Sequence, residues 1–174
     1  MSLEQLPPSA PDLRALLGPL LRHGVDFVLV GGVAGQSHGS SYPTYDLDVV
    51  YARDRENVGR LVEALREIGV RLRGAPPDLP FLLDAKTIEN GSNFTFITPH
   101  GDFDILGHAD GMPTYDELRS EASMRDILGF EVRVASIDHL IAMKRAANRP
   151  KDRLAVEEYI VIADEQRRLS KDSE

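Results

Sequence analysis

The chain contains no cysteine and no tryptophan, and it has no long hydrophobic run. The lack of cysteine excludes disulfides, thiolate catalysis and cysteine-ligated zinc. No apolar segment approaches the roughly 20 residues that a membrane-spanning helix needs. The N-terminal stretch MSLEQLPPSAPDL has neither a basic flank nor an apolar core. We therefore expect no secretory signal, no membrane association and a cytoplasmic location.

Positive charge is also scarce. The formal net charge is −8, which argues against a protein that coats nucleic acid through bulk electrostatics. No lysine or arginine lies between Gly32 and Asp46. One candidate basic patch runs from Lys144 to Arg153, around the single acid Asp152. This segment is either a solvated junction between helices or a local patch that contacts an anionic ligand.

The length of 174 residues suits one domain with a substantial core. Hydrophobic residues make up 42% of the chain and charged residues 28%, as in ordinary globular proteins. Because residues 1–11 are rich in proline, we interpret them as a loose leader. We expect a single domain over residues 12–169 and a short tail at 170–174.

Hydrophobic periodicity predicts the order of the secondary structure. Helices are expected at residues 12–23, 55–68 and 114–121, from Ser136 as N-cap, and from Pro150 to about residue 169, with a short helix ending near His38. Strands are expected at residues 27–30, 47–51, 93–98, 103–106 and 130–134, the last returning from a hairpin turn at Gly129. This order predicts an α+β fold, a mixed β-sheet flanked by helices.

Two acids separated by one residue, Asp46 and Asp48, lie at the start of a predicted strand. Positions i and i+2 of a strand point to the same face, so the two carboxylates repel each other unless a cation lies between them. Hard oxygen ligands at this spacing suit Mg²⁺ or Mn²⁺. The alternative is that Asp46 is a turn or capping residue and Asp48 an acid at the sheet edge.

The pair Gly31-Gly32 directly follows an apolar strand. Glycine lets the backbone approach a ligand closely, and the amides at a helix N-terminus favour phosphate. The segment matches neither a P-loop, which needs a Lys-Ser or Lys-Thr pair, nor the G-x-G-x-x-G dinucleotide pattern. An ordinary strand-to-helix turn is therefore the alternative interpretation.

A third carboxylate, Asp104, lies between Phe103 and Ile105 and so interrupts an apolar strand. Asp102 falls in the predicted turn, where aspartate is common for structural reasons. We therefore assign Asp104 to the site and interpret Asp102 as structural.

Lys144 shares one face of its predicted helix with Ile137, Leu140 and Ile141. A lysine in an apolar arc needs a carboxylate or a phosphate as a partner. The alternatives are that its stem carries the ammonium group out to solvent, or that it pairs only with Asp152.

Together these residues resemble the DNA-polymerase-β-like nucleotidyltransferase superfamily, and most closely its small bacterial AbiEii-type branch. The likeness covers about residues 25–165. The motifs that carry it are Gly31-Gly32-Val33-Ala34, His38-Gly39, Thr44-Tyr45-Asp46-Leu47-Asp48, Ile141 to Lys144 and Arg149 to Asp152.

The resemblance implies a polymerase-β-like palm fold and metal-dependent transfer of NMP from an NTP such as ATP to a hydroxyl, with release of pyrophosphate. Asp46 and Asp48 would hold Mg²⁺ or Mn²⁺ on the triphosphate, and Asp104 would complete a second metal position and help activate the acceptor. The expected nucleotide-binding residues are Gly31, Gly32, Ser37, Thr44 and Lys144. The acceptor is RNA or tRNA, a protein or a small molecule, and the toxin relatives imply an antitoxin protein as a partner.

The chain departs from the family pattern in one respect. Relatives often carry an arginine shortly before the T-x-D-x-D segment, whereas this chain has hydroxyl residues there. Hydroxyls can hydrogen-bond to phosphate but cannot neutralise it. A catalytically inactive binding module with the same fold is therefore the alternative function, and a D-x-D glycosyltransferase is a third.

Overall fold

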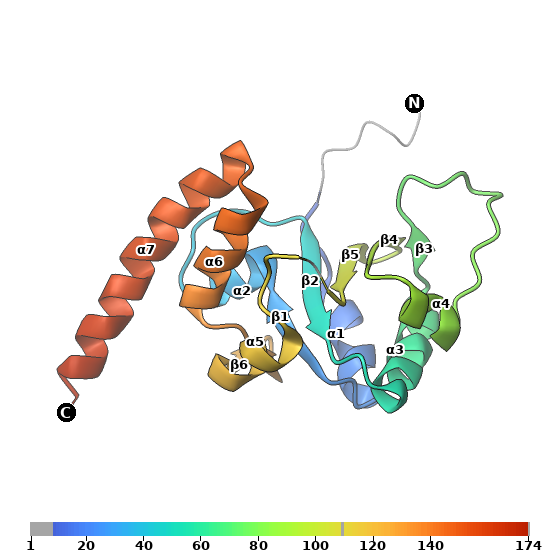
Figure 1. The fold of residues 1–174 in the computed structure, drawn as a ribbon, viewed down its shortest axis with the longest axis horizontal. Helices are drawn as coiled ribbons and strands as arrows, with labels where there is room; N and C mark the ends of the chain where they lie inside the picture. The colour runs from blue at the N-terminus through green and yellow to red at the C-terminus, as the bar shows by residue number, and fades with distance from the viewer. Residues whose placement is uncertain (1–8, 109, 174) are drawn as a thin grey trace.

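The computed structural model describes residues 9–108 and 110–173. Within that part the chain forms one seven-stranded mixed sheet and seven helices (Figure 1). The strand order is β3-β4-β5-β2-β1-β7-β6. The predicted α+β class is confirmed.

The elements have the following bounds. The strands are β1 (Phe27–Val30), β2 (Asp46–Tyr51), β3 (Arg71–Leu72), β4 (Asn93–Thr98), β5 (Gly101–Leu106), β6 (Ser123–Ile127) and β7 (Phe130–Val134). The helices are α1 (Leu13–Arg22), α2 (Gly31–Ser37), α3 (Arg55–Ile68), α4 (Ala85–Asn90), α5 (Tyr115–Glu121), α6 (Ile137–Ala147) and α7 (Pro150–Lys171).

Strand β2 lies in the middle of the sheet and connects its two halves. It is antiparallel to β1 and parallel to β5, which forms a hairpin with β4. On the other side, β1 is parallel to β7, and β7 forms a hairpin with β6. The β2–β5 register places Asp46 opposite Asp102 and Asp48 opposite Asp104. Residues far apart in the sequence are thereby brought side by side.

The alternation of side chains along β2 separates the core from the site. Leu47, Val49 and Tyr51 are fully buried in the main hydrophobic core, which also includes apolar side chains of α1 and α3. Asp46 and Asp48 point to the opposite face, because neighbouring residues of a strand alternate between faces. Helices α6 and α7 lie against each other, far from α1 and α3 in Figure 1, and α7 projects beyond the sheet.

The observed elements differ from the predicted ones in two short elements and in the end of the last helix. The two-residue strand β3 and the six-residue helix α4 were not predicted, because neither is long enough to show a periodic pattern. Helix α4 buries only Ile88 and begins at the side-chain cap of Asp84. Helix α7 continues to Lys171, into the predicted tail, while residues 1–8 of the predicted leader lie outside the described residues. In the described ranges, no helix combines the length and apolar character that crossing a bilayer requires.

Candidate active site

The three predicted acids converge on one face of the sheet. Asp46 and Asp48 come from β2 and Asp104 from the neighbouring β5, in register with Asp48. Each offers a carboxylate oxygen, and these oxygens all lie within 4.8 Å of one another. Such a cluster offers the hard oxygen donors that a divalent cation prefers.

The acids disturb one another electrostatically. Burial, followed by the charges of Asp46 and Asp104, raises the pKa of Asp48 to about 8. Burial also raises the pKa of Asp104, against the opposing effect of the Arg73 guanidinium. Because like charges close together resist ionisation, a cation among them would favour the carboxylate form of all three. The residues present therefore fit a bound divalent metal.

The glycine turn closes over these acids. Gly31 has a φ of +69°, a conformation that side chains rarely adopt, and a Cβ atom there would collide with the Asp48 carboxylate. A Cβ atom on Gly32 would lie 2.6 Å from Thr44 Oγ1. Two glycines in succession are thus required, because the start of α2 lies directly against Asp48 of β2 and against Thr44.

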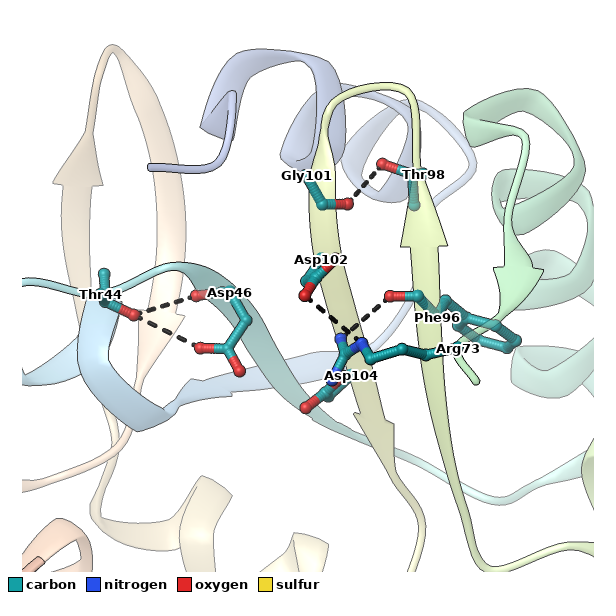
Figure 2. Close-up of polar contacts among 8 residues, drawn as sticks. All are labelled: Thr44, Asp46, Arg73, Phe96, Thr98, Gly101, Asp102 and Asp104. Carbon is teal, nitrogen blue, oxygen red and sulfur yellow. Dashed lines mark hydrogen bonds and ion pairs between the residues drawn. The ribbon is translucent and has the colours of Figure 1, made fainter. Parts of the chain in front are cut away.

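The structure brings Thr44 to the acids but not Ser37. The Thr44 hydroxyl donates to the Asp46 backbone carbonyl at 3.2 Å and lies 3.5 Å from its carboxylate (Figure 2). Ser37 lies in the last turn of α2, where its hydroxyl donates back to the Ala34 carbonyl at 2.7 Å. It does not belong to the lining of the cavity described next.

A cavity of about 360 Å³ lies between the acids and the C-terminal helices. We call it the acid cavity. Its polar lining includes Gly31, Gly32, Ser40, Tyr42, Thr44, Asp46, Asp48, Asp104, Lys144, Arg149, Lys151 and Tyr159. Three carboxylates of the sheet therefore share one cavity with three cationic side chains of α6 and the α6–α7 junction.

A buried carboxylate holds two of these cations. Asp152 is only 1% exposed, and its two oxygens lie 3.3 Å from Lys144 Nζ and 2.7 Å from Arg149 Nε. These two partners hold the pKa of Asp152 below its usual value despite its burial. The predicted alternative of a Lys144–Asp152 pair is present, yet Lys144 also lines the acid cavity.

Sequence reasoning missed Arg73, which follows the edge strand β3. Its Nη2 atom lies 2.7 Å from Asp104 Oδ1 and donates to the Phe96 carbonyl at 3.0 Å, and its Nε atom lies 3.4 Å from Asp102 Oδ2 (Figure 2). Asp102 thus helps to position the Arg73 guanidinium, which contacts Asp104. No pattern in the sequence pairs residue 73 with residue 104, because the pairing depends on β3 joining β4.

Sequence reasoning also missed Glu158 of α7. The Glu158 carboxylate accepts hydrogen bonds from the Ser41 backbone amide at 3.1 and 3.2 Å and from the Ser41 hydroxyl at 2.6 Å, and it also contacts the Ser40 hydroxyl. The segment that lacks lysine and arginine is therefore fixed to α7. His38 similarly joins α2 to α7, with Nδ1 2.9 Å from Gln166 Nε2 and Nε2 2.8 Å from the Ala135 carbonyl oxygen.

Comparison with solved structures places the fold among nucleotidyltransferases. The chain is similar to the lincosamide antibiotic adenylyltransferase LnuA with bound lincomycin (TM-score 0.58, 14% identity, covering 86% of this chain and 95% of that one). It is also similar to ANT(2'')-Ia in complex with adenylyl-2''-tobramycin (TM-score 0.52, 17% identity, 91% and 96%). A candidate nucleotidyltransferase from Thermotoga maritima matches as well (TM-score 0.51, 15% identity, 85% and 89%). Neither a protein-family profile nor a curated protein matches the chain significantly.

Proposed function

We propose that the protein is a metal-dependent nucleotidyltransferase that binds an NTP in the acid cavity and moves its NMP group to a hydroxyl acceptor. The observation that carries the proposal is the convergence of Asp46, Asp48 and Asp104 opposite cationic side chains in one cavity. A triphosphate site needs both the acids and the cations. The acids hold a metal that the triphosphate oxygens also bind, and the cations neutralise the charge of the triphosphate. The nucleotidyltransferase fold of the solved structures supports the same conclusion.

The reaction assigns a task to each group of side chains. The acceptor oxygen forms a bond to the α-phosphorus, the bond from that phosphorus to the bridging oxygen breaks, and pyrophosphate leaves. Asp104 is placed to receive the hydroxyl proton, since it faces the cavity from the strand beside Asp46 and Asp48. When bound by the three acids, Mg²⁺ or Mn²⁺ would neutralise the charge that develops on the attacking and leaving oxygens.

The C-terminal helices provide the positive charge that the segment before Asp46 lacks. Lys144, Arg149 and Lys151 line the acid cavity and can contact the β- and γ-phosphates of a bound triphosphate. The absence of an arginine before Asp46 therefore does not by itself favour the inactive binding module, and the three retained acids oppose it. Gly31, Gly32 and Thr44 remain the proposed contacts on the opposite side of the cavity.

The acceptor is a separate question from the transfer reaction. The solved structures include proteins that carry lincomycin or adenylylated tobramycin, which are small hydroxylated molecules. The sequence resemblance to AbiEii-type enzymes points instead to RNA or tRNA, with an antitoxin protein as partner. Both remain proposals for this chain.

Transfer of label tests the proposed function. The purified protein is incubated with each NTP labelled at the α-phosphate, with Mg²⁺ or Mn²⁺ and with a cell lysate as the source of acceptors. We expect metal-dependent labelling that disappears in Asp46→Asn and Asp48→Asn. Asp78→Asn, at an exposed position outside the acid cavity, is the matched control and should retain activity. Persistent labelling in the Asp46→Asn/Asp48→Asn double variant would overturn the proposed site.

A further inference from the structure

We propose that a second, larger cavity beside the acid cavity is the acceptor site, and that it takes a small amphipathic hydroxyl compound, neutral or cationic, and not a nucleic acid. This inference rests on the proposed function. The second cavity has a volume of about 810 Å³ and lies over the ends of β2 and β5, residues 107–108 and 112–114, and α5.

The second cavity continues the face that carries the acids. Val50 of β2 pairs with Leu106 of β5, two positions beyond the Asp48–Asp104 pair. Both pairs point to the same face, about 7 Å apart along the strands. A molecule lying over Val50 and Leu106 can therefore extend a hydroxyl toward the α-phosphate of an NTP that is held beside Asp104.

The two cavities share part of their walls. Leu106, Met112 and Met143 line both of them. Methionine side chains are flexible and polarisable, so they form a wall that adapts to ligands of different shape. The apolar floor formed by these residues with Val50 and Tyr115 suits an acceptor that has one apolar face.

The charged rim of the second cavity disfavours phosphate. Three carboxylates line it, those of Asp26, Asp54 and Asp116. Of its three basic side chains, Arg53 already donates to the backbone carbonyls of Glu89 at 2.8 Å and Gly91 at 3.1 Å, and only Arg119 and His108 remain. An RNA end requires several phosphate contacts from basic residues, and this rim does not offer them.

The size of the second cavity also favours a small molecule. Cavities of about 300–1,000 Å³ commonly enclose most of the surface of a drug-sized ligand. A protein or folded RNA acceptor would instead need an open surface large enough for a specific macromolecular contact. The described part of the chain thus has a lined cavity at the position where the acceptor must enter.

Two identical substitutions at different places test the inference. Ser92 lines the second cavity and is absent from the acid cavity, so Ser92→Trp should fill the acceptor site and leave the triphosphate site intact. Ser120, on the exposed side of α5, lines neither cavity, and Ser120→Trp is the matched control. Each variant is assayed with α-labelled NTP against three separate acceptor fractions of a lysate: the dialysable small molecules, the total RNA and the dialysed protein.

We expect labelled product only from the dialysable fraction, with kcat/KM reduced at least tenfold in Ser92→Trp and unchanged in Ser120→Trp. Metal-dependent NTP binding, measured by calorimetry, should be equal in all three proteins. Labelling of RNA or protein that Ser92→Trp leaves unchanged would overturn the acceptor site while the proposed transfer reaction stands. Absence of both NTP binding and labelling in the wild-type protein would overturn the proposed function, and the acceptor site with it.

Discussion

At the scale of single residues, the most informative side chain of the site is Asp48, whose ionised form is unfavourable in the folded protein. Burial and the charges of Asp46 and Asp104 raise the pKa of the Asp48 carboxyl to about 8. A side chain of this kind lowers the stability of the metal-free protein. The proposed function accounts for its presence on a central strand, because a bound cation would offset this cost.

The first prediction concerns Asp48→Asn in the presence of a chelator. The folded protein retains a proton on Asp48 up to about pH 8, whereas the unfolded chain releases it near pH 4. Between these values the unfolded state binds fewer protons, so wild-type stability falls as pH rises. Asparagine does not titrate, so the free energy of unfolding of Asp48→Asn should exceed that of wild type by a margin that grows from pH 4 to pH 8. Urea titrations at several pH values measure this margin, and a margin that does not change with pH would contradict the account.

The second prediction concerns Arg73, which contacts Asp104 from outside the acid cavity. Arg73→Met removes the cation that orients this carboxylate, so kcat for transfer should fall by about 10- to 100-fold, as for other partners of metal-binding groups. Mn²⁺ should bind at least as tightly as before, because a competing positive charge has been removed. Steady-state kinetics and Mn²⁺ calorimetry separate the two effects. Arg71→Met, at the exposed first residue of β3, is the control. An Arg73→Met protein that loses Mn²⁺ affinity and kcat together would contradict the assignment.

At the scale of elements, the junction between α6 and α7 supplies the positive charge that the segment before Asp46 lacks. Asp152 at the start of α7 holds Lys144 and Arg149 at the edge of the acid cavity. Because Asp152 is buried and pairs with both cations, it fixes the positions of their charged groups. In the proposed function the two helices therefore provide the cationic side of the triphosphate site.

The third prediction concerns Asp152→Asn. Asparagine keeps the size of the side chain but loses the charge-assisted hydrogen bonds, which contribute about 1.5–3 kcal/mol each. The released cations should contact the triphosphate less well, so KM for NTP should rise about tenfold with a smaller change in kcat. The control is Asp164→Asn in the same helix, which breaks only an exposed pair with Arg167. An unchanged KM with a reduced kcat would show that the junction does not serve nucleotide binding.

The fourth prediction concerns the turn from β1 into α2. Gly31 and Gly74 have similar φ angles of +69° and +75°, but only Gly31 has the Asp48 carboxylate where a Cβ atom would lie. The backbone cost of alanine in this conformation is about 1–2 kcal/mol at either position. Gly31→Ala should therefore reduce the free energy of unfolding by more than Gly74→Ala, and only Gly31→Ala should lower Mn²⁺ affinity. Equal effects in chemical denaturation and calorimetry would mean that the turn is not in contact with the site.

At the scale of the whole molecule, the sequence was sufficient to predict the features that depend on periodicity and local chemistry, which are the main helices and strands and the three acids. The strand period of two placed Asp46 and Asp48 on one face, and the apolar run around Asp104 marked it as exceptional. Arg73 could not be predicted, because its contact depends on an edge strand of two residues. Ser37 was assigned to the nucleotide site although it faces its own helix, since seven residues of α2 give little information about helical phase. The second cavity could not be predicted either, because it forms where the ends of β2 and β5 meet α5 and α6, which are far apart in the sequence.

The last prediction treats the protein as a unit whose stability depends on the cation. A ligand present at 100 times its dissociation constant stabilises the folded state by about 2.7 kcal/mol. For a chain of this size each kcal/mol raises Tm by about 2–4 °C, so saturating Mn²⁺ should raise Tm by about 5–10 °C relative to chelator. The three acids come from two strands that pair only in the folded sheet, so the unfolded chain has no equivalent site. Calorimetry of the Asp46→Asn/Asp48→Asn double variant should show almost no shift. An equal shift in both proteins would place the cation elsewhere.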